Sequence, residues 1–231
     1  MSSKQVIITG AAGNLGRAIT NLFIDKGFSV HAIISPDDNP GFINNNKLNV
    51  YQADLASENE TLSVIKVIFN NIENLDFVIM TVGGYASGSL NEVTVTDINK
   101  MIRLNFFTAF NIAKSVFNVM EEQTKPCRFV FIGARPGLDT LQGINMVAYT
   151  LSKSLIFKLS EIINEEGKKK NIKSFVVVPG VIDTPRNRAA MPDADFTKWV
   201  RPEEIAGKIL NLEKIPDNKL KQKIIEIYGE S

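Results

Sequence analysis

The chain has 231 residues with 26 basic and 25 acidic side chains, so its net charge of +1 offers no bulk attraction for nucleic acid. No apolar run is long enough to span a bilayer, and the first residues lack the pattern of a signal peptide. A single cysteine, Cys127, excludes an internal disulfide and favours a reducing, cytoplasmic compartment. The single histidine, His31, is interpreted as structural, and no Cys/His zinc site is expected.

The first predicted unit is a strand, a glycine turn and a helix between Val6 and Gly27. The apolar run 6–8 predicts a strand buried on both faces, and apolar residues at helical spacing follow the turn. Three glycines at a three-residue spacing form the turn: Gly10, Gly13 and Gly16. Glycines let the backbone approach a ligand, and the N-terminus of a helix attracts anions. The spacing alone leaves open a phosphate-binding loop or a turn needed only for packing.

Strands and helices alternate along the rest of the chain. Further strands are predicted at 30–34, 48–52, 77–80, 129–132, 172–178 and 223–228. Helices are predicted at 62–72, 96–122, 147–166 and 202–212, with Thr96 or Asp97 as the N-cap of the second. This alternation predicts one α/β domain over residues 1–231, with a doubly wound parallel sheet and helices on both faces. Ligands bind such sheets beyond the carboxyl ends of the strands.

Tyr149 and Lys153 lie four residues apart on the predicted helix 147–166, so they share one face. An unperturbed phenol, with a pKa of about 10, is a poor acid–base catalyst at neutral pH. A neighbouring ammonium stabilises the phenolate and would lower that pKa. The order of the other motifs strengthens the functional interpretation of this pair. The glycine turn comes first, then Asp54, then Asn105 in the long helix, and a Pro-Gly segment after the sixth strand.

In this order of motifs the chain resembles the short-chain dehydrogenase/reductase family along its whole length. The resemblance implies a Rossmann fold, an NAD or NADP cofactor, a small-molecule substrate and no metal. It implies that Tyr149 donates a proton, that Lys153 lowers its pKa and binds the nicotinamide ribose, and that Asn105 supports a proton path through water. The implied cofactor-binding residues are Gly10, Gly13, Asn14, Leu15, Gly16, Ser35, Asp54, Leu55, Gly83, Lys153, Pro179, Gly180 and Thr184.

The main departure from the family pattern is Ala134, which stands where a serine hydroxyl normally polarises the substrate carbonyl. Losing one such donor typically costs on the order of a hundredfold in rate. Ser152 and Ser154 flank Lys153, and neither is expected to replace the missing serine. Three interpretations follow: a slow carbonyl reductase, a reductase whose substrate does not need the serine, or a nucleotide-binding protein without catalysis.

Segments 83–86, 133–139 and 187–199 resemble the dihydropteridine reductase branch of the family, which also carries alanine at this position. The branch implies hydride transfer to a conjugated C=N system, with the Tyr149 proton delivered to nitrogen. Tyr85 either stacks on a flat substrate or is a loop aromatic without such a role. Two alternatives are a cofactor-binding sensor without catalysis and a nucleotide-sugar epimerase, for which the chain is short.

The choice between NAD and NADP stays open. Ser35 stands at the end of the second strand, where an acid normally binds the ribose 2′-hydroxyl. Asp37 and Asp38 would repel a 2′-phosphate, whereas Arg17 is a cation that could reach it. The helices 96–122 and 147–166 carry apolar residues on more than one face, which predicts a homodimer or homotetramer.

Overall fold

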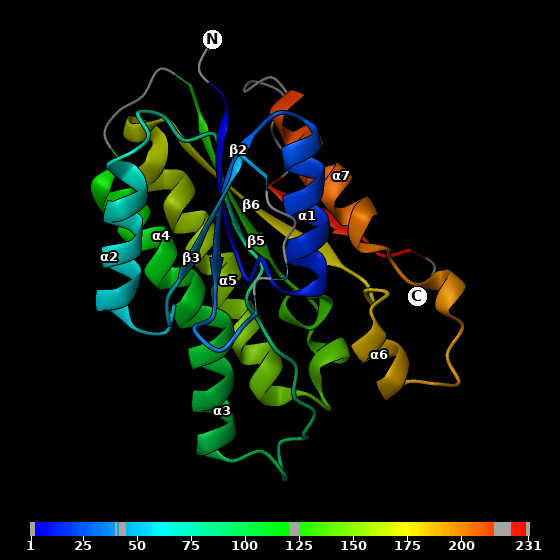
Figure 1. Cartoon of the computed structure of the whole chain (residues 1–231). Helices are drawn as coiled ribbons and strands as arrows, with labels where there is room; N and C mark the ends of the chain where they lie inside the picture. Colours follow the sequence, from blue (N-terminus) through cyan, green and yellow to red (C-terminus); the bar gives the residue numbers. More distant parts are fainter. Residues whose placement is uncertain (1–2, 40, 42–44, 121–124, 215–222, 230–231) are drawn as a thin grey trace.

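A computed structural model describes residues 3–39, 41, 45–120, 125–214 and 223–229 (Figure 1). The described residues form one seven-stranded sheet in the order β3-β2-β1-β4-β5-β6-β7, and each neighbouring pair is parallel. The strands are β1 Gln5–Thr9, β2 Ser29–Ile34, β3 Leu48–Gln52, β4 Phe77–Met80, β5 Cys127–Ile132, β6 Ile172–Pro179 and β7 Ile224–Ile227. The α-helices are α1 Asn14–Asp25, α2 Glu58–Phe69, α3 Val95–Met101, α4 Thr108–Val119, α5 Val147–Glu166, α6 Pro185–Ala190 and α7 Pro202–Asn211.

Helices cover both faces of the sheet, with α2, α4 and α5 on one face and α1 and α7 on the other (Figure 1). Each face has its own apolar core, because successive strand residues point to opposite sides. In β1, for example, Ile7 belongs to the core under α4 and α5, while Val6 and Ile8 belong to the core under α1. Strands buried on both faces explain the continuous apolar runs, and the predicted doubly wound sheet is confirmed.

The order of the strands reverses between β1 and β4, which lie side by side. The connection after β1 leads towards β2 and that after β4 towards β5, so the two connections leave the sheet in opposite directions. The Thr81 hydroxyl, just after β4, donates to the Thr9 carbonyl at 2.7 Å. This bond joins the glycine turn to the loop that carries Gly83. In Figure 1, α3 and α6 lie at this same end of the sheet.

The long helix predicted at 96–122 is wrong as a single α-helix. The helical region begins with α3. Thr94 is the N-cap of α3 and forms a capping box with Asp97, so neither Thr96 nor Asp97 is the N-cap. A π-helical segment, Ile102–Phe107, follows, and α4 then ends at Val119. The predicted last residues, 121–122, lie outside the described residues. The wider π-helical turn carries Asn105, and π-helical segments of this kind often accompany functional sites.

The other predicted boundaries agree with the structure or differ from it by a few residues. The strands 48–52 and 77–80 and the helix 147–166 have the predicted bounds. Helix α2 begins four residues before the predicted Leu62, because the side chain of Ser57 accepts a hydrogen bond from the Glu60 N–H and caps it there. A short helix, α6, and a 3₁₀ turn, Phe196–Lys198, occupy the segment that follows β6.

Candidate active site

The glycine turn after β1 depends on two of its three glycines. Gly10 has φ +64°, which L side chains rarely adopt, and the Gly13 N–H donates to the Gly10 carbonyl at 3.0 Å. A Cβ on Gly16 would lie 2.2 Å from that same carbonyl oxygen. Helix α1 then begins with Asn14 and Leu15, and its first turn has no acidic side chain. The turn therefore leads directly into the N-terminus of α1, the end of a helix that attracts anions.

Asp54, one of the implied cofactor-binding residues, lies two residues after the end of β3. One carboxylate oxygen accepts the Ala56 N–H at 2.9 Å, and the other contacts the Arg103 guanidinium at 3.3 Å. Leu55 is buried, and its carbonyl accepts a hydrogen bond from Asn111. Arg103 was not predicted as part of the site, because it lies 49 residues from its partner and no spacing rule joins them.

Asn105 connects three parts of the candidate site and is buried. Its side-chain oxygen accepts the Gly84 N–H at 2.8 Å, and its amide donates to the Gly84 carbonyl at 3.1 Å. The same amide donates to the Ser152 hydroxyl at 2.9 Å, next to Lys153 on α5. A Cβ on Gly83 would lie 2.8 Å from the Asn105 oxygen and 3.4 Å from the Lys153 amine. The loop after β4 is thus held between Asn105 and Lys153.

Lys153 is only 5% exposed, and its amine donates to the Ile132 carbonyl at the end of β5, at 2.8 Å. Tyr149 lies one turn earlier on α5 and is half-buried. Its ring packs against that of Tyr85, with centroids 5.3 Å apart and ring planes at 67°. Among the described residues, no hydrogen bond joins the Tyr149 hydroxyl to Lys153.

Burial controls the protonation of this pair. It lowers the pKa of Lys153 to about 8, because the buried ammonium loses hydration. Burial, and then the charge of a nearby Tyr85 phenolate, raises the pKa of Tyr149 to about 12. The expected lowering of the Tyr149 pKa by Lys153 is therefore not what the structure shows. Desolvation and Tyr85 both raise this pKa, and the Lys153 amine donates its hydrogen bond to the Ile132 carbonyl.

The position of the missing serine lies close in sequence to the carbonyl that Lys153 contacts. Ala134 is buried and lies two residues after Ile132, the last residue of β5. The Ser152 hydroxyl donates to the Tyr149 carbonyl at 2.7 Å, and the Ser154 hydroxyl donates to the Thr150 carbonyl at 2.9 Å. Both hydroxyls thus bond to the backbone of their own helix, which agrees with the expectation that neither replaces the serine.

The loop after β2 places Arg17 near the candidate adenosine end. The Ser35 N–H donates to the Asp38 carboxylate at 3.3 Å, and Ser35 is exposed. The Arg17 guanidinium donates to the carbonyls of Ala12, at 2.7 Å, and Gly41, at 3.3 Å. Arg17 thus bridges the glycine turn and this loop, as its position at the start of α1 suggested.

The segment after β6 completes the same edge of the sheet. Pro179 is the last residue of β6, and the Gly180 N–H donates to the Ile227 carbonyl of β7 at 2.8 Å. The Thr184 side chain caps α6 by accepting the Asn187 N–H at 3.2 Å. Further along, Trp199 is buried and packs on Phe196 at 4.8 Å between ring centroids.

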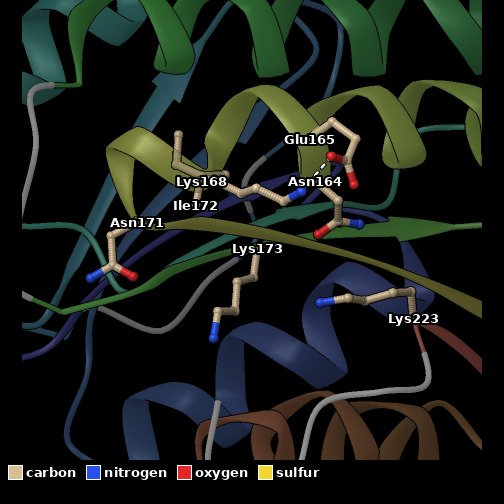
Figure 2. A pocket seen from close by; sticks show the side chains of 7 residues that line it. All are labelled: Asn164, Glu165, Lys168, Asn171, Ile172, Lys173 and Lys223. Atoms are coloured by element: carbon tan, nitrogen blue, oxygen red, sulfur yellow. Dashed lines mark hydrogen bonds and ion pairs between the residues drawn. The ribbon is translucent and has the colours of Figure 1, made fainter. Parts of the chain in front are cut away.

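Other features of the described residues carry no part of this site. His31, in β2, hydrogen-bonds to Gln5 and Tyr51 on the flanking strands, which fits its structural interpretation. Figure 2 shows a pocket at the amino end of β6, lined by Asn164, Glu165, Lys168, Asn171, Ile172, Lys173 and Lys223, none of which is a predicted site residue. No group of three or more His, Cys, Asp or Glu side chains in the described part could hold a metal. Among the described helices, none is long and apolar enough to cross a membrane.

Comparisons with known proteins agree with the motifs. The family model for short chain dehydrogenases matches residues 4–195. The chain is 26% identical over 222 residues to a dihydropteridine reductase of Dictyostelium discoideum, covering 94% of this chain and 90% of that protein. It is 26% identical over 227 residues to carbonyl reductase family member 4 of Xenopus tropicalis, covering 93% and 92%. A solved structure of ElxO with NADP bound has a TM-score of 0.84 at 22% identity, covering 99% and 98%.

Because the family model covers most of its length, the chain belongs to the short-chain dehydrogenase family. Members of this family are NAD(P)-dependent oxidoreductases, and relatives of this chain carry reductase names. The family, fold class and enzyme class expected from the sequence are therefore confirmed. The roles of individual residues remain predictions.

Proposed function

We propose that the chain transfers a hydride from NAD(P)H to a conjugated C=N or C=O bond of a small molecule, with Tyr149 as the proton donor, similar to dihydropteridine reductase. The observation that carries this proposal is the buried Lys153 amine, one helical turn from Tyr149 and next to Gly83. Both side chains lie at the carboxyl edge of the sheet, where ligands of such folds bind.

The residues at this edge fit a nicotinamide dinucleotide. A Cβ at Gly10 or Gly16 would meet Thr81 or the backbone, so these glycines allow the close packing of the turn that leads into the N-terminus of α1, the part of a helix that attracts anions. We assign the pyrophosphate to the turn residues Gly10, Gly13, Asn14, Leu15 and Gly16. We assign the adenosine end to Ser35, Asp54 and Leu55, and the nicotinamide end to Gly83, Lys153, Pro179, Gly180 and Thr184. The bound reduced nicotinamide supplies the hydride.

Tyr149 carries its proton at neutral pH, as a proton donor must, but its raised pKa of about 12 also makes it a weak acid, so it needs a cation to stabilise its phenolate. Lys153, with its pKa lowered to about 8, is mostly an ammonium at the same pH. Once Tyr149 gives up its proton, this ammonium stabilises the phenolate. Asn105, hydrogen-bonded to Gly84 and Ser152, supports a water path that returns a proton.

Ala134 favours an acceptor that needs little polarisation at the reduced atom. A conjugated C=N or quinone system disperses the incoming negative charge over several atoms, so one fewer donor costs less. The 26% identity to the dihydropteridine reductase of Dictyostelium supports this substrate class. The equal identity to carbonyl reductase family member 4 supports carbonyl reduction as the second candidate.

We propose a homodimer or homotetramer in a cytoplasmic setting. Several apolar side chains are exposed on the outer side of the π-helical segment and α5, on one side of the sheet: Phe107, Leu151, Leu155 and Ile162. Covering them with the same face of a second copy would remove apolar area from water. Light scattering at micromolar concentration tests this, and a monomer would contradict it.

A substrate panel tests the proposed activity. The purified chain is mixed with NADH or NADPH and with quinonoid dihydropterin, a small quinone or a simple ketone, and the absorbance of the reduced cofactor is followed. We expect the pterin or the quinone to be reduced faster than the ketone, because of Ala134. Tight cofactor binding without oxidation by any acceptor would contradict the proposal and support the sensor alternative.

A further inference from the structure

The candidate site has one hydroxyl fewer than hydride transfer in this family normally uses. Ala134 is only 6% exposed and has no polar side-chain atom. The hydroxyls of Ser152 and Ser154 donate to main-chain carbonyls of α5. Any second donor to the atom that is protonated therefore comes from another element at this edge.

Tyr85 lies on a segment held at both ends. On one side, Gly84 exchanges hydrogen bonds with Asn105 through its N–H and its carbonyl. On the other, the Gly88 N–H donates to the Asn145 carbonyl at 2.8 Å, and the Val147 N–H donates to the Gly88 carbonyl at 3.0 Å. The second anchor lies at the first residue of α5, the helix that carries Tyr149. The position of Tyr85 relative to Tyr149 is thus set by backbone hydrogen bonds.

The two phenol side chains are neighbours, but only one is committed to the protein interior. Their ring centroids are 5.3 Å apart, and Tyr85 is 59% exposed. Among the described residues, the Tyr85 hydroxyl makes no hydrogen bond to the protein. It is therefore available to a ligand that lies against Tyr149. A charge on Tyr85 also contributes to the raised pKa of Tyr149, which agrees with their closeness.

We propose that the Tyr85 hydroxyl is the second hydrogen-bond donor to the atom that Tyr149 protonates, in place of the serine missing at Ala134. This role rests on the proposed function. The hydride forms the new C–H bond, the π electrons of the acceptor move to its O or N atom, and the Tyr149 proton forms the new O–H or N–H bond. Tyr85 keeps its own proton and stabilises the negative charge that develops on that atom.

Three variants separate hydrogen bonding from ring contact. Tyr85→Phe keeps the ring and removes the hydroxyl, Tyr85→Leu removes both, and Ala134→Ser restores a hydroxyl at the usual position. The assay uses the acceptor from the substrate panel with the highest wild-type turnover. We expect Tyr85→Phe to lower kcat roughly a hundredfold, with the Kd of NADPH unchanged. Adding Ala134→Ser to Tyr85→Phe restores at least part of kcat.

The matched control is Tyr51→Phe, which removes a phenol hydroxyl from β3, where it bonds to His31. It should leave kcat at the wild-type value. If Tyr85→Phe keeps full turnover while Tyr149→Phe loses it, the role of Tyr85 is wrong and the proposed function stands. A loss in Tyr85→Phe that comes with weaker NADPH binding, and that Ala134→Ser does not relieve, also overturns it. Full turnover in Tyr149→Phe would instead overturn the proposed function itself.

Discussion

The Lys153 amine donates a hydrogen bond to the Ile132 carbonyl at 2.8 Å, so the end of β5 holds a buried cation at the middle of helix α5. A carbonyl oxygen satisfies only one of the three donors of an ammonium group. The remaining cost of burial explains the lowered pKa of about 8. The same buried cation lies where the family resemblance places a group that binds the nicotinamide ribose.

This burial predicts a pH dependence of stability. An unfolded lysine has a pKa near 10.5, whereas Lys153 has a pKa of about 8 in the folded chain. Between these values the unfolded state binds more protons, so the lysine makes the free energy of unfolding rise with pH, by up to about 3 kcal/mol. Urea unfolding at several pH values from 8 to 10 measures this rise in the free energy of unfolding. The rise should be smaller in Lys153→Met, and equal slopes in both proteins would contradict the account.

Asn105 and Asn111 form a matched pair of buried asparagines for testing the π-helical anchor. Asn105→Ala removes the bonds to Gly84 and Ser152, and leaves the half-buried N–H and carbonyl of Gly84 without these partners. Asn111→Ala removes one bond, to the Leu55 carbonyl. We expect urea unfolding to show a loss of about 2–4 kcal/mol for Asn105→Ala and about 1–2 kcal/mol for Asn111→Ala. A smaller loss for Asn105→Ala than for its control would show that the anchor is unimportant.

Gly16 and Gly207 test the glycine turn against an ordinary helical glycine. A Cβ on Gly16 would lie 2.2 Å from the Gly10 carbonyl oxygen, so Gly16→Ala must displace the turn. A Cβ on Gly207, in α7, meets nothing within 4 Å. Gly207→Ala should stabilise the chain by roughly 0.5–1 kcal/mol, because alanine favours helix. Gly16→Ala should destabilise the chain and weaken NADPH binding, measured by quenching of Trp199 fluorescence; wild-type affinity would contradict this.

Asp54 tests the assignment of the adenine end. A carboxylate there would accept a hydrogen bond from the adenine amino group, which the hypoxanthine analogue of NADH lacks. Asp54→Ala should weaken NADH binding about tenfold, which corresponds to one hydrogen bond of roughly 1.4 kcal/mol. Binding of the hypoxanthine analogue should change less. If both dinucleotides lose affinity equally, Asp54 acts by holding Arg103 rather than by contacting the base.

Patterns among residues close in sequence were enough to predict much of the fold and part of the candidate site. The apolar period of helix 147–166 and its Tyr149–Lys153 spacing depend only on residues close in sequence, and the helix has the expected bounds. The glycine turn is local in the same way. The apolar pattern of helix 96–122 does not predict its break, because apolar residues continue through it; only the family resemblance implied a kink at Asn105. Asn105 is held there by Gly84, 21 residues away, and no local period carries that information.

The pKa values of the site residues also could not be predicted from the sequence. The four-residue spacing predicts that Lys153 lies near Tyr149, and hence a lowered phenol pKa. In the structure the direction is upward, because burial of the Tyr149 phenol and the neighbouring Tyr85 raise this pKa. The bond from Lys153 to Ile132 and the contact between Tyr85 and Tyr149 both arise from tertiary packing.

The most direct test of the central claim is Tyr149→Phe, compared with wild type for both cofactor binding and turnover. The substitution removes only the hydroxyl, and Tyr85 keeps its ring partner. We predict that the Kd of NADPH stays within about twofold, while kcat falls by on the order of a hundredfold or more, since one general acid contributes 10²–10⁴-fold. Wild-type turnover in Tyr149→Phe would contradict the claim that this phenol delivers the proton.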